Sequence, residues 1–273
     1  MMIREEALSG LPLSCHVIDT HTHMGPYHLY GWHQKYDSTN TSSVLKDMER
    51  MGVDCIVTAP HPMIQERMEE ANQMAEHLIK QYPGKVYGYI SIVPVCGLDS
   101  IKSELKKYAK DPGFLGLKLL PGYHGTLKQP EYEYVMDFAD EIECTVLCHE
   151  WYGVPAWLDF SDSLKNRHKM KLIIAHQGGG CTDSTRFCAP IIREYENAYL
   201  ELSGSLFNQL TVGQIVELVG SDKVIFGTDA INLDPKYEFG KVAFSDLDDR
   251  IKKKIFAENY LHLLENSQMG RII

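Results

Sequence analysis

Histidine and carboxylate residues with the spacing of metal ligands occur near the start of the chain. They form the run Asp19-Thr20-His21-Thr22-His23. If this run ends a strand, Asp19, His21 and His23 share one face, because alternate side chains of a strand point the same way. Neutral imidazole nitrogens and carboxylate oxygens suit a borderline divalent cation such as zinc. A His-x-His pair alone is a weak signal, so further ligands must come from elsewhere.

Residues of the same kinds close three later apolar segments. They are His149, His176 and Asp229. With His21 and His23, they place four histidines and one aspartate at the ends of four separate segments. Three or four such ligands around one open position are typical of a catalytic rather than a structural site. The joint pattern therefore predicts a metal centre.

Lys118 also ends an apolar segment, and it shares a face with Phe114 and Gly116. Three interpretations are open. A carboxylated Lys118 would bridge two metal ions, with His149 and His176 shared toward the second. A free ammonium would pair with a substrate carboxylate. In the third interpretation the ammonium reaches solvent beyond the site.

The elements that must position these residues alternate regularly along the chain. Short apolar runs rich in β-branched residues predict eight strands: Cys15–His21, Asp54–Ala59, Val86–Val93, Phe114–Leu120, Thr145–His149, Leu172–His176, Tyr199–Ser203 and Val224–Thr228. Amphipathic segments between and after them predict eight helices: Ser42–Met51, Ile64–Gln81, Asp99–Lys110, Glu131–Ile142, Leu158–His168, Thr185–Asn197, Gln209–Val219 and Leu247–Glu265. This alternation requires parallel strands with right-handed crossovers.

Eight such units without a linker or a break in composition predict a single α/β domain over residues 1–273, a (β/α)8 TIM barrel. The length of 273 residues and mass of 31.0 kDa agree with the usual barrel size of roughly 250 residues. Barrel enzymes carry their chemistry at the carboxyl ends of the strands. The candidate ligands stand at those ends.

Composition excludes several classes of protein. A net charge of −10 and a pI near 5.6 oppose binding to nucleic acid or to an anionic membrane surface. No segment approaches the roughly 20 apolar residues of a membrane span, and residues 1–13 lack the apolar core of a signal peptide. Seven cysteines, several in apolar runs, are expected to be structural thiols. We therefore expect a cytoplasmic protein with a small-molecule substrate.

The motifs together resemble the amidohydrolase superfamily over nearly the whole chain. Within it, the compact length, the segment Gly116-Leu117-Lys118, the turn at 175–179 and a final helix with Glu258-Asn259-Tyr260 resemble the amidohydrolase-related (amidohydrolase 2) branch. That branch includes metal-dependent hydrolases and nonoxidative decarboxylases similar to aminocarboxymuconate semialdehyde decarboxylase. The resemblance implies a homodimer and a single divalent ion, Zn²⁺ in the first place and Mn²⁺ as the second choice. A single ion favours the free amine of Lys118.

By this resemblance His21, His23, His149 and Asp229 bind the metal, and His176 acts beside it. The expected reaction is hydrolysis of an amide, ester or lactone: water on the metal attacks the carbonyl, Asp229 accepts a proton and protonated His176 stabilises the oxyanion. The same ligands also suit the alternative, a nonoxidative decarboxylase or hydratase acting on a small carboxylic acid. A barrel that only binds a metal or a ligand is the third reading.

Further residues are candidates for the substrate pocket. His61 and His124 follow strands, and Arg186 could clamp a carboxylate, although each also has an ordinary surface interpretation. Asp19 is expected below the metal, either orienting a ligand or making a structural hydrogen bond. The loop after His23 is rich in aromatic residues and predicts a pocket wall or a subunit interface: Tyr27, His28, Tyr30, Trp32, His33 and Tyr36.

Overall fold

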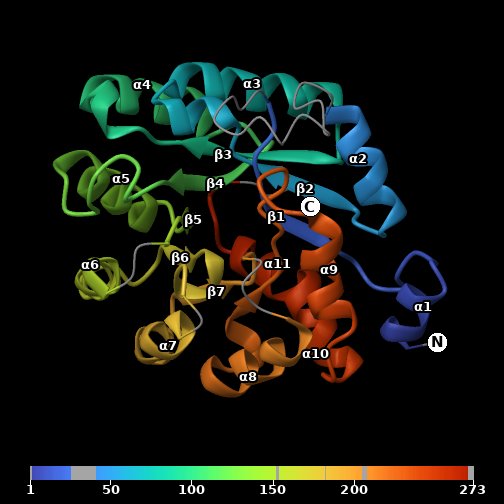
Figure 1. The fold of residues 1–273 in the computed structure, drawn as a ribbon. Coiled ribbons are helices and arrows are strands. Elements are labelled where there is room, and N and C mark those ends of the chain that lie inside the picture. The colour runs from blue at the N-terminus through green and yellow to red at the C-terminus, as the bar shows by residue number, and fades with distance from the viewer. Residues whose placement is uncertain (1, 26–40, 152–153, 182, 205–207, 270–273) are drawn as a thin grey trace.

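Eight parallel strands run in sequence order around the centre of the molecule (Figure 1). The computed structural model describes residues 2–25, 41–151, 154–181, 183–204 and 208–269, so the predicted aromatic loop lies outside the described residues. The strands are β1 (Ile18–Thr22), β2 (Cys55–Thr58), β3 (Val86–Ser91), β4 (Phe114–Leu119), β5 (Thr145–Cys148), β6 (Lys171–Ile174), β7 (Ala198–Glu201) and β8 (Val224–Ile225). Each begins within three residues of its predicted start.

Contacts between the first and last strands close the sheet into a barrel. The Thr20 amide donates to the Phe226 carbonyl at 3.3 Å, and the Asp229 amide donates to the His21 carbonyl at 2.7 Å. Asp19 strengthens this seam, because its carboxylate accepts from the Thr228 amide at 3.0 Å and from the Thr228 hydroxyl at 2.6 Å. The predicted (β/α)8 barrel is confirmed, and Asp19 belongs to its closing seam.

Helices surround the barrel in a ring, apart from the last one, which lies near its centre in this view (Figure 1). They are α1 (Ile3–Leu8), α2 (Thr41–Arg50), α3 (Met68–Gln81), α4 (Leu98–Tyr108), α5 (Pro130–Glu141), α6 (Val154–Leu164), α7 (Ser184–Glu194), α8 (Gln209–Val219), α9 (Pro235–Ala243), α10 (Asp249–Lys253) and α11 (Asn259–Leu264). Because the helices cover the outer face and side chains fill the inside, every residue of β4 is buried. None of these described helices combines the length and the apolar character that crossing a bilayer requires.

The end of the chain differs from the single long helix predicted for 247–265. A π-helical segment, Lys254–Glu258, separates α10 from α11. Within α11, the Asn259 amide group donates to the carbonyls of Ser221 and Val224 at 2.8 and 2.7 Å, and the Tyr260 hydroxyl lies 3.0 Å from that of Tyr89. Since Val224 is the first residue of β8, α11 packs against the amino end of the barrel and leaves the opposite end for chemistry.

Candidate metal centre and active site

Three ligand atoms from the two strands of the closing seam lie together. His21 Nε2 and His23 Nε2 are 3.2 Å apart, and Asp229 Oδ1 lies 3.6 and 3.3 Å from them, respectively. His21 is the last residue but one of β1, His23 follows that strand, and Asp229 follows β8. All three side chains are buried. These atoms form a group with the composition and spacing of a metal site.

The hydrogen bonds behind the two imidazoles determine which nitrogen carries the proton. His21 Nδ1 is 3.0 Å from the Glu201 carboxylate, and His23 Nδ1 is 2.6 Å from the Ala59 carbonyl. Both partners accept, so both Nδ1 atoms donate and both Nε2 atoms present lone pairs to each other. Burial also lowers the pKa of both histidines well below the usual value, which keeps them neutral. Two lone pairs and a carboxylate oxygen facing one another fit a divalent cation.

Lys118 lies at the same centre. Its ammonium Nζ is 2.7 Å from His21 Nε2, and the side chain has no exposed surface. The interpretation that Lys118 reaches solvent is therefore wrong. Burial lowers the pKa of Lys118 to about 8, whereas burial raises the pKa of Asp229.

Asp229 is held by Asn232 of the loop after β8, and Asn232 in turn contacts His61. The Asn232 amide donates to Asp229 Oδ1 at 3.0 Å, and Asn232 Oδ1 lies 2.9 Å from His61 Nε2. The ring of His61 stacks on that of His23, with centroids 5.6 Å apart. His61 therefore lies at the site, where it contacts the ring of His23 directly and Asp229 through Asn232.

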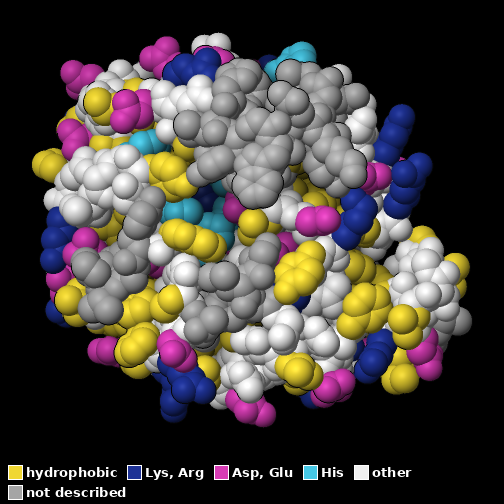
Figure 2. Space-filling view, viewed as in Figure 1, with side chains coloured by type: hydrophobic (Ala, Val, Ile, Leu, Met, Phe, Trp, Pro, Cys, Tyr) yellow, Lys and Arg dark blue, Asp and Glu magenta, His cyan; other side chains and the backbone are white. Residues whose placement is uncertain are grey.

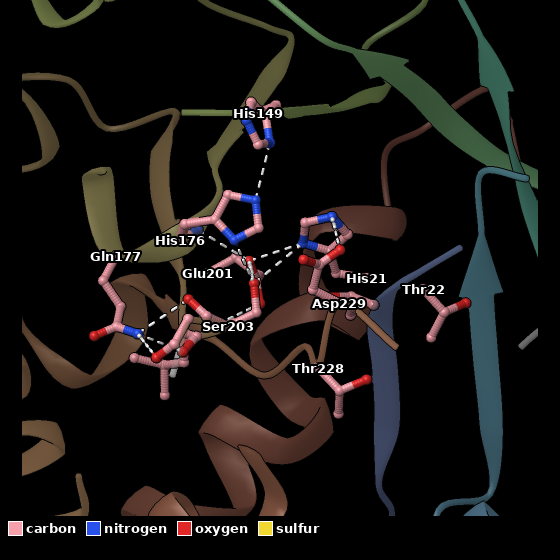
Figure 3. Close-up of polar contacts among 12 residues, drawn as sticks. His21, Thr22, His149, His176, Gln177, Glu201, Ser203, Thr228 and Asp229 are labelled. Atoms are coloured by element: carbon pink, nitrogen blue, oxygen red, sulfur yellow. Dashed lines mark hydrogen bonds and ion pairs between the residues drawn. The ribbon is translucent and has the colours of Figure 1, made fainter. Parts of the chain in front are cut away.

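His149 and His176 form a second part of the site, shown in Figure 3. His176 Nε2 is 2.9 Å from His149 Nδ1, and His176 Nδ1 is 2.9 Å from the Ser203 hydroxyl. Ser203 also contacts the Glu201 carboxylate at 2.8 Å. The structure therefore brings His149 and His176 together. His176 and Glu201 form a second possible ligand group with His21, whereas His149 belongs to neither group found among the described residues.

The backbone at this end of the barrel is unusual. His176, Gln177 and Asp229 have φ values of 57°, 58° and 56°, in the left-handed region that residues with a β-carbon rarely adopt. The Gln177 amide group holds its turn by donating to the carbonyls of Leu202 and Ser203 at 2.8 and 3.0 Å. Such strain concentrates at functional sites, where the surrounding structure imposes it.

Three residues of the site were not predicted from the sequence: Glu201, Ser203 and Asn232. Glu201 and Ser203 end a predicted apolar strand, and a carboxylate within such a strand was a usable signal, because an acid is rarely buried without partners. Asn232 lies in an irregular loop, where neither strand nor helix periodicity places a side chain.

Arg186 and His124, the other two predicted pocket residues, lie in different surroundings. Arg186 is on α7 with its side chain 74% exposed, and its guanidinium lies 3.9 Å from Asp183. His124 is half-buried in the loop after β4, and burial lowers its pKa. It lies close enough to His149 for a charge on either ring to disfavour a charge on the other. Neither residue is in the ligand group of His21, His23 and Asp229.

Figure 2 shows histidine side chains at the floor of a hollow in the middle of this face. Two aromatic residues that are partly exposed contact them. The ring of Trp151, 39% exposed, lies 5.4 Å from that of His176, and the ring of Tyr123, 46% exposed, lies 5.1 Å from that of His149. The site therefore opens to solvent between aromatic side chains.

Solved structures share this fold at low sequence identity. One is 2,6-dihydroxybenzoate decarboxylase from Rhizobium, with 15% identity and a TM-score of 0.73 over 92% of this chain and 99% of that one. Another is a dihydroxybenzoic acid decarboxylase from Polaromonas sp. JS666 with bound manganese and the inhibitor 2-nitroresorcinol (14%, TM-score 0.71, 92% and 97%). A third is 4-oxalomesaconate hydratase from Rhodopseudomonas palustris (17%, TM-score 0.67, 92% and 96%).

No curated protein sequence matches the chain. A family model does: the model described as amidohydrolase matches residues 18–264, from the first residue of β1 to the last residue of α11. The match thus spans every strand of the barrel and every residue of the metal-ligand group, and it places this chain in the amidohydrolase family.

Proposed function

We propose that this chain is a metal-dependent lyase that acts on a small carboxylic acid, by nonoxidative decarboxylation in the first place and by hydration as the second candidate. The observation that carries the proposal is the buried ammonium of Lys118, 2.7 Å from His21 Nε2. A cation held without solvent beside a metal site favours an anionic substrate. The similarity to two decarboxylases and a hydratase supports this alternative better than the hydrolysis expected first from the sequence.

In the proposed reaction the substrate carboxylate and a neighbouring oxygen enter the hollow above His21 and His23. A divalent ion held by His21, His23 and Asp229, with His149 as the predicted fourth ligand, would withdraw electrons from these oxygens. Zn²⁺ and Mn²⁺ both suit this donor set. Lys118 stabilises negative charge on the neighbouring oxygen while the bond to the carboxylate breaks.

The electron pair of the broken bond remains on the substrate carbon, carbon dioxide leaves, and that carbon must take up a proton. Asp229 is the group proposed to hold this proton, because its Oδ1 lies beside the ligand nitrogens of His21 and His23. Both ring nitrogens of His176, the other residue expected to act here, are already engaged by Ser203 and His149. Trp151 and Tyr123 form the walls that limit water entry. For hydration, Asp229 would instead take a proton from water and deliver it to the substrate carbon.

The test compares two substrate panels on chain loaded with Mn²⁺ or Zn²⁺. One contains aromatic and unsaturated acids with a hydroxyl or keto group next to the carboxylate, followed by carbon dioxide release and by absorbance. The other contains lactones, esters and amides. We expect turnover only on the acids, together with about one metal ion per chain by elemental analysis. Hydrolysis of the second panel, with none of the acids consumed, would contradict the proposal.

Two aspartate variants sharpen this comparison. Asp229→Asn removes a proposed ligand and is expected to lose both metal and turnover. Asp234→Asn changes an aspartate that caps α9 by accepting from the Lys236 amide at 2.9 Å, and asparagine caps helices equally well. We expect the Asp234→Asn variant to keep both metal and turnover.

A further inference from the structure

We infer that Glu201 and Ser203 act together as a positioning device that determines which ring nitrogen of His176 and of His149 carries the proton, so that His149 presents the Nε2 lone pair a metal ligand needs. We call the chain Glu201, Ser203, His176 and His149 the proton-ordering chain. It is visible as the row of dashed contacts in Figure 3. The inference deepens the proposed metal site and adds two residues to it.

The chain starts at Glu201, whose two oxygens both act as acceptors. The Ser203 backbone amide donates to Oε1 at 2.6 Å, and the His176 backbone amide donates to Oε2 at 3.3 Å. Backbone amides can only donate, so neither oxygen needs to carry a proton of its own. Glu201 is completely buried in β7, where such donors compensate its charge.

Ser203 is the next member, and it has a single hydroxyl proton. Its oxygen lies 2.8 Å from Glu201 Oε2, which accepts that proton. The same oxygen lies 2.9 Å from His176 Nδ1 and can there only accept. His176 must therefore donate from Nδ1.

A neutral His176 that donates from Nδ1 has a lone pair on Nε2. This Nε2 lies 2.9 Å from His149 Nδ1, so His149 donates from Nδ1 and has its own lone pair on Nε2. One proton on each ring satisfies all of these contacts. The hydrogen-bond directions that begin at Glu201 therefore determine the protonated nitrogen of His176 and then that of His149, the predicted fourth ligand.

Glu201 also fixes the proton of His21 on Nδ1, because this nitrogen donates to Glu201 Oε2 at 3.0 Å. Glu201 thus determines directly which ring nitrogen of His21 carries the proton. It determines the same for His149, which follows β5, through Ser203 and His176. Ser203 is the link whose removal leaves the ligand His21 its shorter contact: the Ser203 hydroxyl lies 3.4 Å from His21 Nδ1, whereas Glu201 Oε2 lies 3.0 Å from it. In Ser203→Ala, His176 loses its Nδ1 acceptor, and we expect its proton to move to Nε2. His149 would then accept at Nδ1 and carry its proton on Nε2.

The experiment records long-range ¹H–¹⁵N correlation spectra of the histidine rings at pH 7.5, in metal-free and Zn²⁺-loaded protein. His176→Asn and His149→Asn spectra assign the signals. We expect Nδ1–H forms of both histidines in the native chain and Nε2–H forms in Ser203→Ala. Zn²⁺ affinity, measured by competition with a chromophoric chelator, is expected to fall about 10- to 100-fold in Ser203→Ala, as for other residues behind metal ligands.

Two further variants serve as controls. Ser203→Thr keeps the hydroxyl and should restore the native spectra. Ser91→Ala removes another buried serine near the end of a strand, whose hydroxyl makes no hydrogen bond to the described residues, and it should change neither spectra nor affinity.

The spectra of the metal-free native chain separate the two proposals. An Nε2–H form of His176 there would overturn the proton-ordering chain whether or not the protein binds zinc. An unchanged form in Ser203→Ala would overturn it as well. The expected forms in a native chain that binds no metal would leave the chain of protons intact and contradict the metal site.

Discussion

Lys118 presents a buried ammonium beside an imidazole lone pair, and the proposed function uses its charge to select anionic substrates. A lysine without exposed surface must be compensated, because an isolated buried charge is strongly unfavourable. The carboxylates of Asp229 and Glu201 supply part of this compensation, and in the proposed reaction a substrate oxygen adds to it. Under this proposal the charge of Lys118 contributes to turnover more than to metal binding.

We predict that Lys118→Gln lowers kcat/KM about 10²- to 10³-fold, the usual effect of losing one group that stabilises developing negative charge. Elemental analysis should still find about one metal ion per chain. A fall from two ions to one would instead show that a carboxylated Lys118 bridges two metals. Lys252→Gln is the matched control, because Lys252 is equally buried and its ammonium donates to the Ala243 carbonyl at 3.1 Å in another part of the molecule.

At the scale of elements, the loop after β8 is the segment that sets the position of Asp229. Asn232 contacts both Asp229 and His61, so one amide side chain connects a ligand to the residue stacked behind His23. Residues of this kind determine metal affinity through the orientation of the ligands.

We predict that Asn232→Ala weakens Zn²⁺ binding about 10- to 100-fold in a chelator competition. Asn208→Ala is the control: Asn208 caps α8 by accepting from the Leu210 amide at 3.0 Å, so its loss should cost about 1 kcal/mol of stability and leave Zn²⁺ affinity unchanged. Equal weakening in both variants would mean that Asn232 acts through general stability alone.

The elements also show what the sequence could predict. Strand starts and most helices were predictable, because the strands are apolar runs buried on both faces and the helices carry an apolar stripe. Helix α9 was missed, since it has only nine residues and Gly240, a poor helix former, lies inside it. Glu201 and Ser203 were missed because their partners, His21 and His176, come from other strands. Such contacts across the barrel leave no local signal in the chain.

At the scale of the whole molecule, stability depends on polar contacts between layers as well as on the apolar core. Asn72 of α3 links β3 to α4: its carbonyl accepts from the Ser91 amide at 2.7 Å and its amide group donates to Glu104 at 2.8 Å. Burial raises the pKa of Glu104, so the ionised form destabilises the folded state.

We predict that Glu104→Gln raises Tm near pH 8, where Glu104 is ionised in both states and the burial penalty is complete. The gain should shrink as pH falls through the folded-state pKa and vanish below the unfolded-state pKa of about 4.3. Each pKa unit is worth about 1.4 kcal/mol, and each kcal/mol about 2–4 °C of Tm. Thermal unfolding from pH 4 to 8 measures the difference. A constant offset for Glu104→Gln over this pH range would contradict the prediction.

The position of the metal-ligand group in the closing seam has a consequence for how the protein matures. His21 and His23 leave the ribosome early, whereas Asp229 follows after roughly 200 further residues, about 10 to 40 s later at 5–20 residues per second. A nascent chain therefore cannot assemble the ligand set until β8 has emerged and paired with β1. Acquisition of the metal would follow closure of the barrel and join its first and last strands.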